Sequence, residues 1–381
     1  MKKLLSFVTV MMLAASLAAC GSSQPAETTA AATEAAAETE AVTEAAETEA
    51  AAETEAVTEA AAETTAAAEE TEAVEEAAES AEADYETEAA ESEEAEEEDK
   101  ENYDTGDASL DDPLNADEIG ENELLVVSFG TSFNDSRRQT IGAIESTMIN
   151  AFPDYSVRRA FTSQIIIDHV KKRDNVTIDN LTEALDRAVN NGVKTLVVQP
   201  THLMNGFEYT DVVDELGNYS DAFEKIAVGQ PLLTTDEDFE KVIGIITDAT
   251  KEYDDGETAI IFMGHGTEAD SNGVYAKMQD MIKADGFDHY YIGTVEATPS
   301  LDDVVKAAKD GGYKRVVLEP LMIVCGDHAN NDMAGDEEDS WKSVFEKEGF
   351  EVECVMRGLG ELPGIQEMIA AHAQEAVDSL Q

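Results

Sequence analysis

The sequence predicts an α/β protein of two similar lobes, each a parallel sheet of about four strands with helices on both faces. Short apolar runs alternate with amphipathic helical patterns through residues 121–381, which is typical of repeated strand–helix units. Two segments of the first half also match two of the second, VVSFGT (126–131) with IIFMGHGT (260–267) and VKTLVVQPTHLMNG (193–206) with YKRVVLEPLMIVCG (313–326). We therefore expect one lobe over residues 121–253, a similar one over 254–381, and a ligand cleft between them.

The predicted first lobe contains four buried strands separated by helices. Strands buried on both faces read as continuous apolar runs such as ELLVVSF, whereas helices place apolar residues every three or four positions. On these patterns the strands span residues 123–129, 155–160, 194–199 and 225–228. One helix ends near Ala151, and the others span 163–172, 178–191, 207–217 and 236–251.

The predicted second lobe repeats this order. Its strands span residues 258–263, 288–295, 314–319 and 350–355, and its helices span 271–284, 301–310, 338–347 and 363–380. The run RVVLEPLMIV (315–324) predicts a strand buried on both faces, and the polar residues from Gly326 to Asp332 favour turns. His328 is therefore expected just past the carboxyl end of a central strand, where open α/β sheets bind ligands.

The first 20 residues resemble a secretion signal. Lys2 and Lys3 precede an apolar run, and small residues then lead to Cys20. The segment LAACGSS (17–23) is similar to the lipobox of bacterial lipoproteins, which implies cleavage before Cys20 and lipid attached to it. We expect an extracytoplasmic protein anchored to the cell membrane. The alternative is an ordinary signal peptide or a short membrane helix, although the run is below the roughly 20 residues of a membrane span.

Residues 21–120 form an acidic, repetitive segment. It contains 35 Asp or Glu and one basic residue, Lys100, and the sequence AAAETEAVTEA occurs at 35–45 and again at 50–60. Such a composition buries too little apolar surface to offset the entropy of ordering. We expect a disordered linker that acts as a solvated spacer.

The remaining 261 residues are also acidic, with 49 acidic and 21 basic side chains. This charge argues against nucleic acid and anionic membrane surfaces as partners of the folded part. Cys325 and Cys354 are either two buried thiols or a disulfide formed in an oxidising compartment. A monomer and a homo-oligomer are both compatible with the sequence.

Three side chains that bind divalent metals follow three different strands of the predicted second lobe: His265, Glu296 and His328. Neighbouring parallel strands lie about 4.8 Å apart, so residues at their carboxyl ends can converge on one ion. Two imidazoles and one carboxylate suit cobalt(II), iron(II), nickel(II) or zinc(II). The alternative is that each histidine binds only the backbone of its own loop.

The other histidines rank lower as metal ligands. His202 follows a strand of the first lobe and either faces the same cleft or packs within its loop. His169, His289 and His372 are expected to be surface or packing residues. The glycine-rich turns form neither a GxGxxG fingerprint nor a GxxxxGK[ST] loop, which argues against a nucleotide site.

Seven segments, in order, resemble the anaerobic sirohydrochlorin cobaltochelatases, class II chelatases of cobalamin biosynthesis. They are LLVVSFGTSFNDS (124–136), RAFTSQII (159–166), VQPTHLMNGFEY (198–209), GQPLL (229–233), FMGHG (262–266), VEATP (295–299) and CGDHANNDMAGDEEDSW (325–341). The last segment is long and unusual in composition, so it is the most specific. Two features depart from the family pattern: VEATP replaces VE-Ser-Tyr-Pro, and Cys325 lies at an apolar position.

The resemblance implies a two-lobed fold that holds a tetrapyrrole substrate and a divalent metal in the cleft, cobalt(II) first, then iron(II) or nickel(II). It assigns the metal ligands to His265, Glu296 and His328, and it makes His265 the proton acceptor. Metal insertion releases two pyrrole N–H protons, and an imidazole with a pKa of about 6.5 can accept a proton at neutral pH. We therefore expect a sirohydrochlorin cobaltochelatase, a lyase of anaerobic cobalamin biosynthesis or tetrapyrrole salvage.

Substrate contacts are expected from Thr131, Arg159 and His202. The substrate carries carboxylates while the folded part is acidic, so a cation must receive it, and Arg159 in RAFTS is the first candidate. Arg137 and Arg138 either share this role or are solvated surface residues.

The expected location departs from the family, because corrin precursors are made in the cytoplasm. Three interpretations follow from it. The protein is an exported chelatase acting on scavenged tetrapyrrole, a component of haem or metal uptake, or a carrier that binds metal or tetrapyrrole without turnover.

Overall fold

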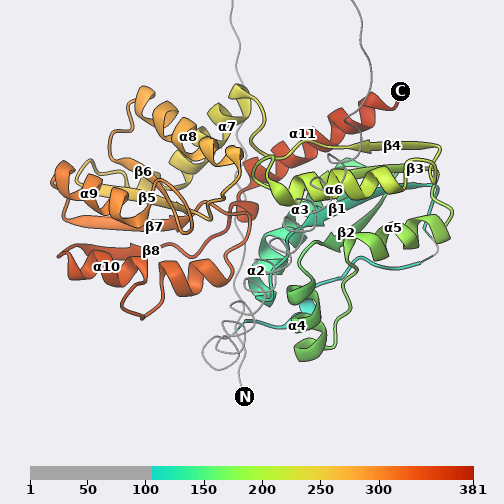
Figure 1. The fold of residues 1–381 in the computed structure, drawn as a ribbon, viewed down its shortest axis with the longest axis horizontal. Helices are drawn as coiled ribbons and strands as arrows, with labels where there is room; N and C mark the ends of the chain where they lie inside the picture. Colours follow the sequence, from blue (N-terminus) through green and yellow to red (C-terminus); the bar gives the residue numbers. More distant parts are fainter. Residues whose placement is uncertain (1–104, 118) are drawn as a thin grey trace, which may run out of the picture. The chain divides into compact units, whose positions relative to one another are not determined.

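The computed structural model describes residues 105–117 and 119–381 (Figure 1). The predicted signal peptide, the predicted lipidation site Cys20 and most of the predicted acidic linker lie outside the described residues. The described part holds two parallel four-stranded sheets with helices packed on them. The predicted two-lobed α/β fold class is confirmed.

The first sheet has the strand order β2-β1-β3-β4, with every neighbouring pair parallel. Its strands are β1 (Asn122–Ser128), β2 (Ser156–Phe161), β3 (Thr195–Pro200) and β4 (Lys225–Val228). The helices between them are α2 (Asn134–Gln139), α3 (Ile141–Ala151), α4 (Gln164–Asp174), α5 (Leu181–Asn190) and α6 (Phe207–Asn218). The short helix η1 (Ala108–Leu110) precedes β1.

The second sheet has the equivalent order β6-β5-β7-β8, also parallel throughout. Its strands are β5 (Thr258–Gly264), β6 (Tyr290–Thr294), β7 (Arg315–Pro320) and β8 (Glu351–Cys354). The helices are α7 (Asp236–Ala249), α8 (Gly273–Ala284), α9 (Leu301–Gly311), α10 (Trp341–Lys347) and α11 (Pro363–Ser379). Short helices are η2 (Lys251–Tyr253), η3 (Asp270–Asn272), η4 (Ala329–Met333) and η5 (Leu359–Glu361).

The two central strands, β1 and β5, are apolar along most of their length because both of their faces are covered. Residues 124–127 of β1 and 259–263 of β5 have no exposed surface. Their side chains point alternately into cores on opposite faces of each sheet, as expected for a parallel sheet between helices. The polar residues that follow each strand therefore lie at the carboxyl edge of the sheet.

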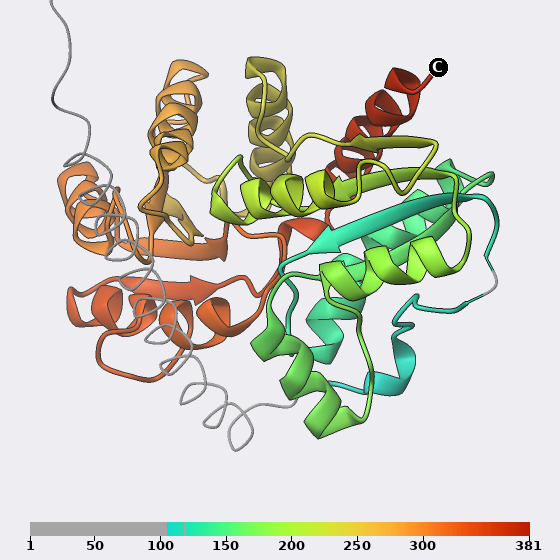
Figure 2. The same ribbon diagram turned by 45° about the vertical axis from the view of Figure 1, so that its right-hand side comes forward.

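The last helix, α11, follows the second sheet in sequence but packs on the first. It contacts α3, β3 and β4 as well as α7, and α7 in turn contacts α8 (Figures 1 and 2). One hydrophobic core accordingly includes residues of both sheets, of α7 and of α11. The packing of α11 on the first sheet therefore joins the two halves of the chain. The lobe boundary predicted between residues 253 and 254 stays a prediction.

Residues 105–117, predicted to belong to the disordered linker, pack on the first lobe instead. The Asp111 carboxylate binds the buried guanidinium groups of Arg137 and Arg159 at 2.6 and 2.7 Å. The carbonyl of Leu114 accepts a hydrogen bond from the backbone N–H of Arg159, and the Asn115 amide donates to a backbone carbonyl. The prediction of disorder was wrong for this segment. It rested on the average composition of residues 21–120, which does not reveal that a single residue, Asp111, pairs with two buried arginines.

Candidate metal centre

Two imidazoles and a carboxylate meet at the carboxyl edge of the second sheet. His265 directly follows β5, Glu296 lies two residues beyond β6, and His328 comes shortly after β7. One potential ligand atom from each of these residues lies within 4.8 Å of the other two. Among the described residues, this is the one group of three or more such side chains close enough to hold a single ion.

The backbone explains how His265 and Glu296 come together. Two backbone hydrogen bonds join the segments that follow β5 and β6: the N–H groups of Val295 and Glu296 donate to the carbonyls of Gly264 and His265. The turn after His265 requires a glycine: Gly266 has a φ of +96°, and a Cβ there would lie 2.8 Å from the backbone nitrogen of Ala297. The two side chains therefore start from residues joined by a backbone hydrogen bond just beyond the strand ends.

The three side chains are close to one another and open to solvent. The imidazole rings of His265 and His328 are nearly perpendicular, with centroids 4.6 Å apart, and His265 Nδ1 lies 3.5 Å from a carboxylate oxygen of Glu296. About 44% of the His265 side chain and 47% of the Glu296 side chain are exposed. His265 and Glu296 are therefore accessible from solvent.

His265 has a defined tautomer. Its Nδ1 lies 2.9 Å from the carbonyl oxygen of Gly266, and a carbonyl can only accept, so this nitrogen carries the hydrogen. In the neutral ring the lone pair is then on Nε2. That atom can either coordinate a metal or accept a proton.

His328 lies on a helical turn, whereas the sequence predicted an irregular loop. Strand β7 ends at Pro320, earlier than the apolar run to Val324 suggests, and the π-helical turn η4 starts at the residue after His328. This turn brings Asp332 beside the ring, with His328 Nδ1 2.6 Å from a carboxylate oxygen. Nδ1 therefore donates to Asp332, and Nε2 remains for the metal.

Asp332 also sets the charge of His328. Burial disfavours the imidazolium, but the hydrogen bond to Asp332 and its negative charge outweigh burial and raise the pKa of His328. Asp332 is not among the site residues predicted from the sequence. The signal for it is the spacing of four between His328 and Asp332, which pairs side chains only once a helical turn is recognised.

The first lobe contacts the segment that carries His328. The Ser136 hydroxyl accepts a hydrogen bond of 3.0 Å from the backbone N–H of Cys325. Thr131, predicted to contact substrate, is buried, and its hydroxyl would lie 3.0 Å from a Cβ added at Gly326. Thr131 therefore packs beneath the segment that presents His328, and its contact with substrate stays a prediction.

His202, also predicted to contact substrate, is not part of the metal group. Both of its ring nitrogens are shielded from solvent and have no hydrogen-bond partner among the described residues. Burial lowers the pKa of His202 to about 4, so the ring is neutral at physiological pH.

Arg159, the first candidate for binding substrate carboxylates, is a structural cation. Its side chain is 1% exposed, and its guanidinium donates to both Glu145 and Asp111. Arg137 is equally buried and binds Asp111, while Arg138 lies at the surface beside Asp135. Four of the five N–H donors of Arg159 are thus bound within the interior, which argues against a role in binding substrate carboxylates, and that role stays a prediction.

The remaining predicted side chains are not part of the metal group. His169 is buried in α4, His289 pairs with Asp254, and His372 is buried on α11. Cys325 and Cys354 are free thiols, and burial raises the pKa of Cys325 to about 12 and that of Cys354 to about 11. Of the two alternatives for the cysteines, the structure has the unpaired thiols.

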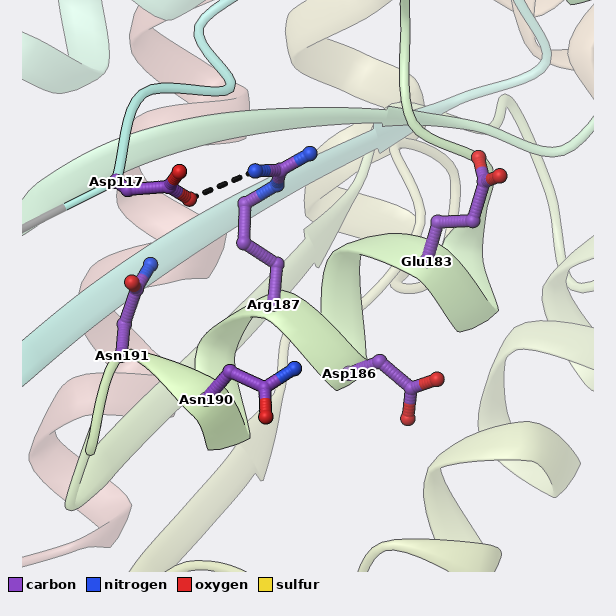
Figure 3. A pocket seen from close by; sticks show the side chains of 6 residues that line it. All are labelled: Asp117, Glu183, Asp186, Arg187, Asn190 and Asn191. Carbon is purple, nitrogen blue, oxygen red and sulfur yellow. Dashed lines mark hydrogen bonds and ion pairs between the residues drawn. The ribbon is translucent and has the colours of Figure 1, made fainter.

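A surface hollow lies elsewhere, along α5. Figure 3 shows the side chains around it, with Arg187 reaching toward Asp117. That guanidinium also binds Asp179, so its charge is already paired with two carboxylates of the protein. The residues that line the hollow are Asp117, Glu183, Asp186, Arg187, Asn190 and Asn191, and none of them is a predicted site residue.

Comparison with known proteins agrees with this site. Residues 122–378 match the family described as Cobalt chelatase (CbiK). The chain belongs to this cobalt chelatase family. Its chemistry as a family member is that of a metal chelatase, a lyase, with cobalt as the metal substrate.

Two relatives carry related names. The Sirohydrochlorin cobaltochelatase of Salmonella typhimurium is 36% identical to this chelatase over 255 residues, which cover 67% of this chain and 96% of the relative. The Sirohydrochlorin cobaltochelatase CbiKC of Nitratidesulfovibrio vulgaris is 30% identical over 259 residues, covering 68% and 91%. Among solved structures, SirB from Bacillus subtilis with Fe3+ aligns with a TM-score of 0.49 and 12% identity, covering 68% of this chain and 97% of that one. The predicted family and enzyme class are confirmed.

Proposed function

We propose that this protein inserts cobalt(II) into sirohydrochlorin, with His265, Glu296 and His328 as the ligands that present the metal. The observation that carries the proposal is the convergence of these three side chains within 4.8 Å at one edge of the second sheet. Two imidazoles and one carboxylate suit cobalt(II), and they also accept iron(II) or nickel(II). The names of the two curated relatives support sirohydrochlorin as the tetrapyrrole.

The proposed reaction replaces two pyrrole N–H protons with one divalent ion. The metal is first held by the three side chains, and His265 then accepts a proton from the macrocycle on Nε2. Protonation removes the lone pair that held the metal, so proton uptake and metal release occur together. The second proton passes to water, which reaches the half-exposed His265 and Glu296 side chains.

His328 has a different role in this scheme. Its Nδ1 is held by Asp332, which orients the ring and keeps Nε2 directed to the ion. His328 therefore acts as a metal ligand, and His265, whose Nδ1 donates to the Gly266 carbonyl and whose Nε2 is free to accept a proton, acts as the base.

The proposed location is outside the cytoplasmic membrane, with a lipid on Cys20. The basis is the signal-like segment that ends in LAACGSS. No helix in the described residues is long and apolar enough to cross a membrane. Cys20→Ser should release the protein from the membrane fraction, and mass spectrometry of the mature N-terminus should find a diacylglyceryl group on wild-type Cys20.

Turnover distinguishes a chelatase from a carrier. Purified protein is mixed with an excess of sirohydrochlorin and cobalt(II), and the absorbance change of metallation is followed. Product in many-fold excess over protein supports the enzyme. Stoichiometric binding without product supports an exported metal or tetrapyrrole carrier, and a parallel haem titration tests a role in haem uptake.

A further inference from the structure

The carboxyl edge of the first sheet repeats the geometry that builds the metal group. The N–H groups of Thr162 and Ser163 donate to the carbonyls of Ser128 and Phe129. In the second lobe the N–H groups of Val295 and Glu296 donate to the carbonyls of Gly264 and His265 in the same way. Phe129 therefore occupies the position of His265, and Ser163 occupies the position of Glu296.

The turns after these positions correspond as well. Gly130 has a φ of +112° and Gly266 a φ of +96°. The gapless match of residues 193–206 with 313–326, continued by two residues, places Glu208 at the position of His328. The first lobe thus carries Phe, Ser and Glu at the three positions where the second carries its ligands, so an aromatic ring stands at the position of His265.

The aromatic ring at this position is exposed. Phe129 is 50% exposed and Phe207 is 61% exposed. They are the two aromatic side chains among the large exposed hydrophobic residues of the described chain. Phe129 follows β1 and Phe207 starts α6 after β3, and β1 and β3 are neighbours in the sheet. Both exposed rings therefore lie at one edge.

That edge is directed toward the second lobe. Thr131, two residues after Phe129, packs against Gly326, two residues before His328. Gly206, the residue before Phe207, lies beside Ser271 of the second lobe, whose hydroxyl would be 3.6 Å from a Cβ at Gly206. Each phenylalanine is thus within two residues of a contact between the lobes.

We propose that Phe129, together with Phe207, forms the surface on which one face of the tetrapyrrole lies, while the metal group faces the macrocycle from the second lobe. This inference rests on the proposed function. A planar macrocycle offers the face that an exposed aromatic ring packs against, and offset stacking stabilises such contacts beyond the area they bury. The first lobe thereby serves the organic substrate, and the second lobe serves the metal.

The test measures sirohydrochlorin and cobalt(II) binding separately, with the purified full chain. Phe129→Ala should weaken sirohydrochlorin binding to metal-free protein by roughly tenfold and raise its KM to match. The cobalt(II) affinity of Phe129→Ala without tetrapyrrole, measured by the cobalt d–d absorption, should stay within about twofold of the wild-type affinity. Phe129→Tyr keeps the ring and should bind like the wild type.

Two controls separate the possible failures. Ile149→Ala removes a side chain of similar exposure, 48%, on α3 and should change neither affinity. His265→Ala should lose cobalt binding and turnover but keep sirohydrochlorin binding. Wild-type affinity in Phe129→Ala, in a protein that turns over, overturns this inference alone. A wild-type protein that binds no sirohydrochlorin overturns the proposed function too.

Discussion

The backbone N–H of Cys325 donates a hydrogen bond to the hydroxyl oxygen of Ser136, 3.0 Å away, and so joins the two lobes three residues before His328. Ser136 lies on α2 of the first lobe, whereas Cys325 begins the segment that presents a metal ligand of the second. The position of His328 therefore depends on the first lobe as well as on its own sheet.

Removing this hydrogen bond should loosen the metal group. We expect Ser136→Ala to lower cobalt(II) affinity a few-fold, because one hydrogen bond contributes about 1 kcal/mol. Isothermal titration with cobalt(II) measures the effect. Ser146→Ala is the matched control, since its hydroxyl binds only the Gly142 carbonyl within α3. Equal affinities in the two variants would show that the contact does not position His328.

The pH dependence of metal binding should follow Asp332. Asp332 raises the pKa of His328, and a proton on that ring competes with the metal. Asp332→Asn should therefore move the pH midpoint of cobalt(II) binding to lower values, while the affinity at pH 8 falls about 10- to 100-fold because the ring is less well oriented. Titrations between pH 5.5 and 8 measure both effects. Asp336→Asn, which removes an exposed partner of Lys342, should leave the midpoint unchanged.

The segment before β1 should contribute strongly to stability. Asp111→Ala leaves the guanidinium groups of Arg137 and Arg159 short of a partner in the interior, which costs about 3–5 kcal/mol. We expect a clearly lower Tm by differential scanning calorimetry. Asp112→Ala, which removes an exposed turn hydrogen bond to Leu114, should lower Tm much less. Similar Tm values for the two variants would mean that residues 105–117 do not stabilise the fold.

Glu123 should make stability depend on pH. It is buried on β1, and burial raises the pKa of Glu123 from 4.5 to about 7. The protonated form thus favours folding: its contribution is complete below about pH 4.5 and is lost as the pH rises through 7. A shift of this size corresponds to about 3 kcal/mol.

Glu123→Gln should therefore raise Tm at pH 8 and change it little at pH 5, as measured by thermal unfolding at both values. Glu121→Gln affects an exposed pair with Lys194 and serves as the control. A Tm difference that is the same at pH 5 and pH 8 would contradict the assignment.

Much of the fold follows from local patterns in the sequence. All eight predicted strands occur, and the strand predicted at 225–228 has the observed bounds of β4. The approach of His265, Glu296 and His328 could be predicted because parallel strands bring their carboxyl ends to one edge. The large separation of these three residues in the sequence does not prevent their approach, because each follows a strand of the same sheet.

Features that depend on tertiary packing could not be predicted from local sequence patterns. The position of α11 on the first sheet is decided by which apolar face remains uncovered, not by neighbours in sequence. Arginine is usually found at the surface, and Arg159 is buried because the carboxylates of Asp111 and Glu145 pair with its charge. Asp332 could not be predicted as a partner of His328, because their contact requires a helical turn in a segment whose residues favour loops.

The central claim is that His265 and His328 hold the metal while it enters the macrocycle. The most direct measurement is a single-turnover absorbance assay with sirohydrochlorin and cobalt(II), comparing the wild type with His265→Ala and His328→Ala. The account predicts that each variant inserts the metal at least about 10²-fold more slowly and binds free cobalt(II) more weakly. Insertion rates and cobalt(II) affinities within a few-fold of the wild type in both variants would contradict it.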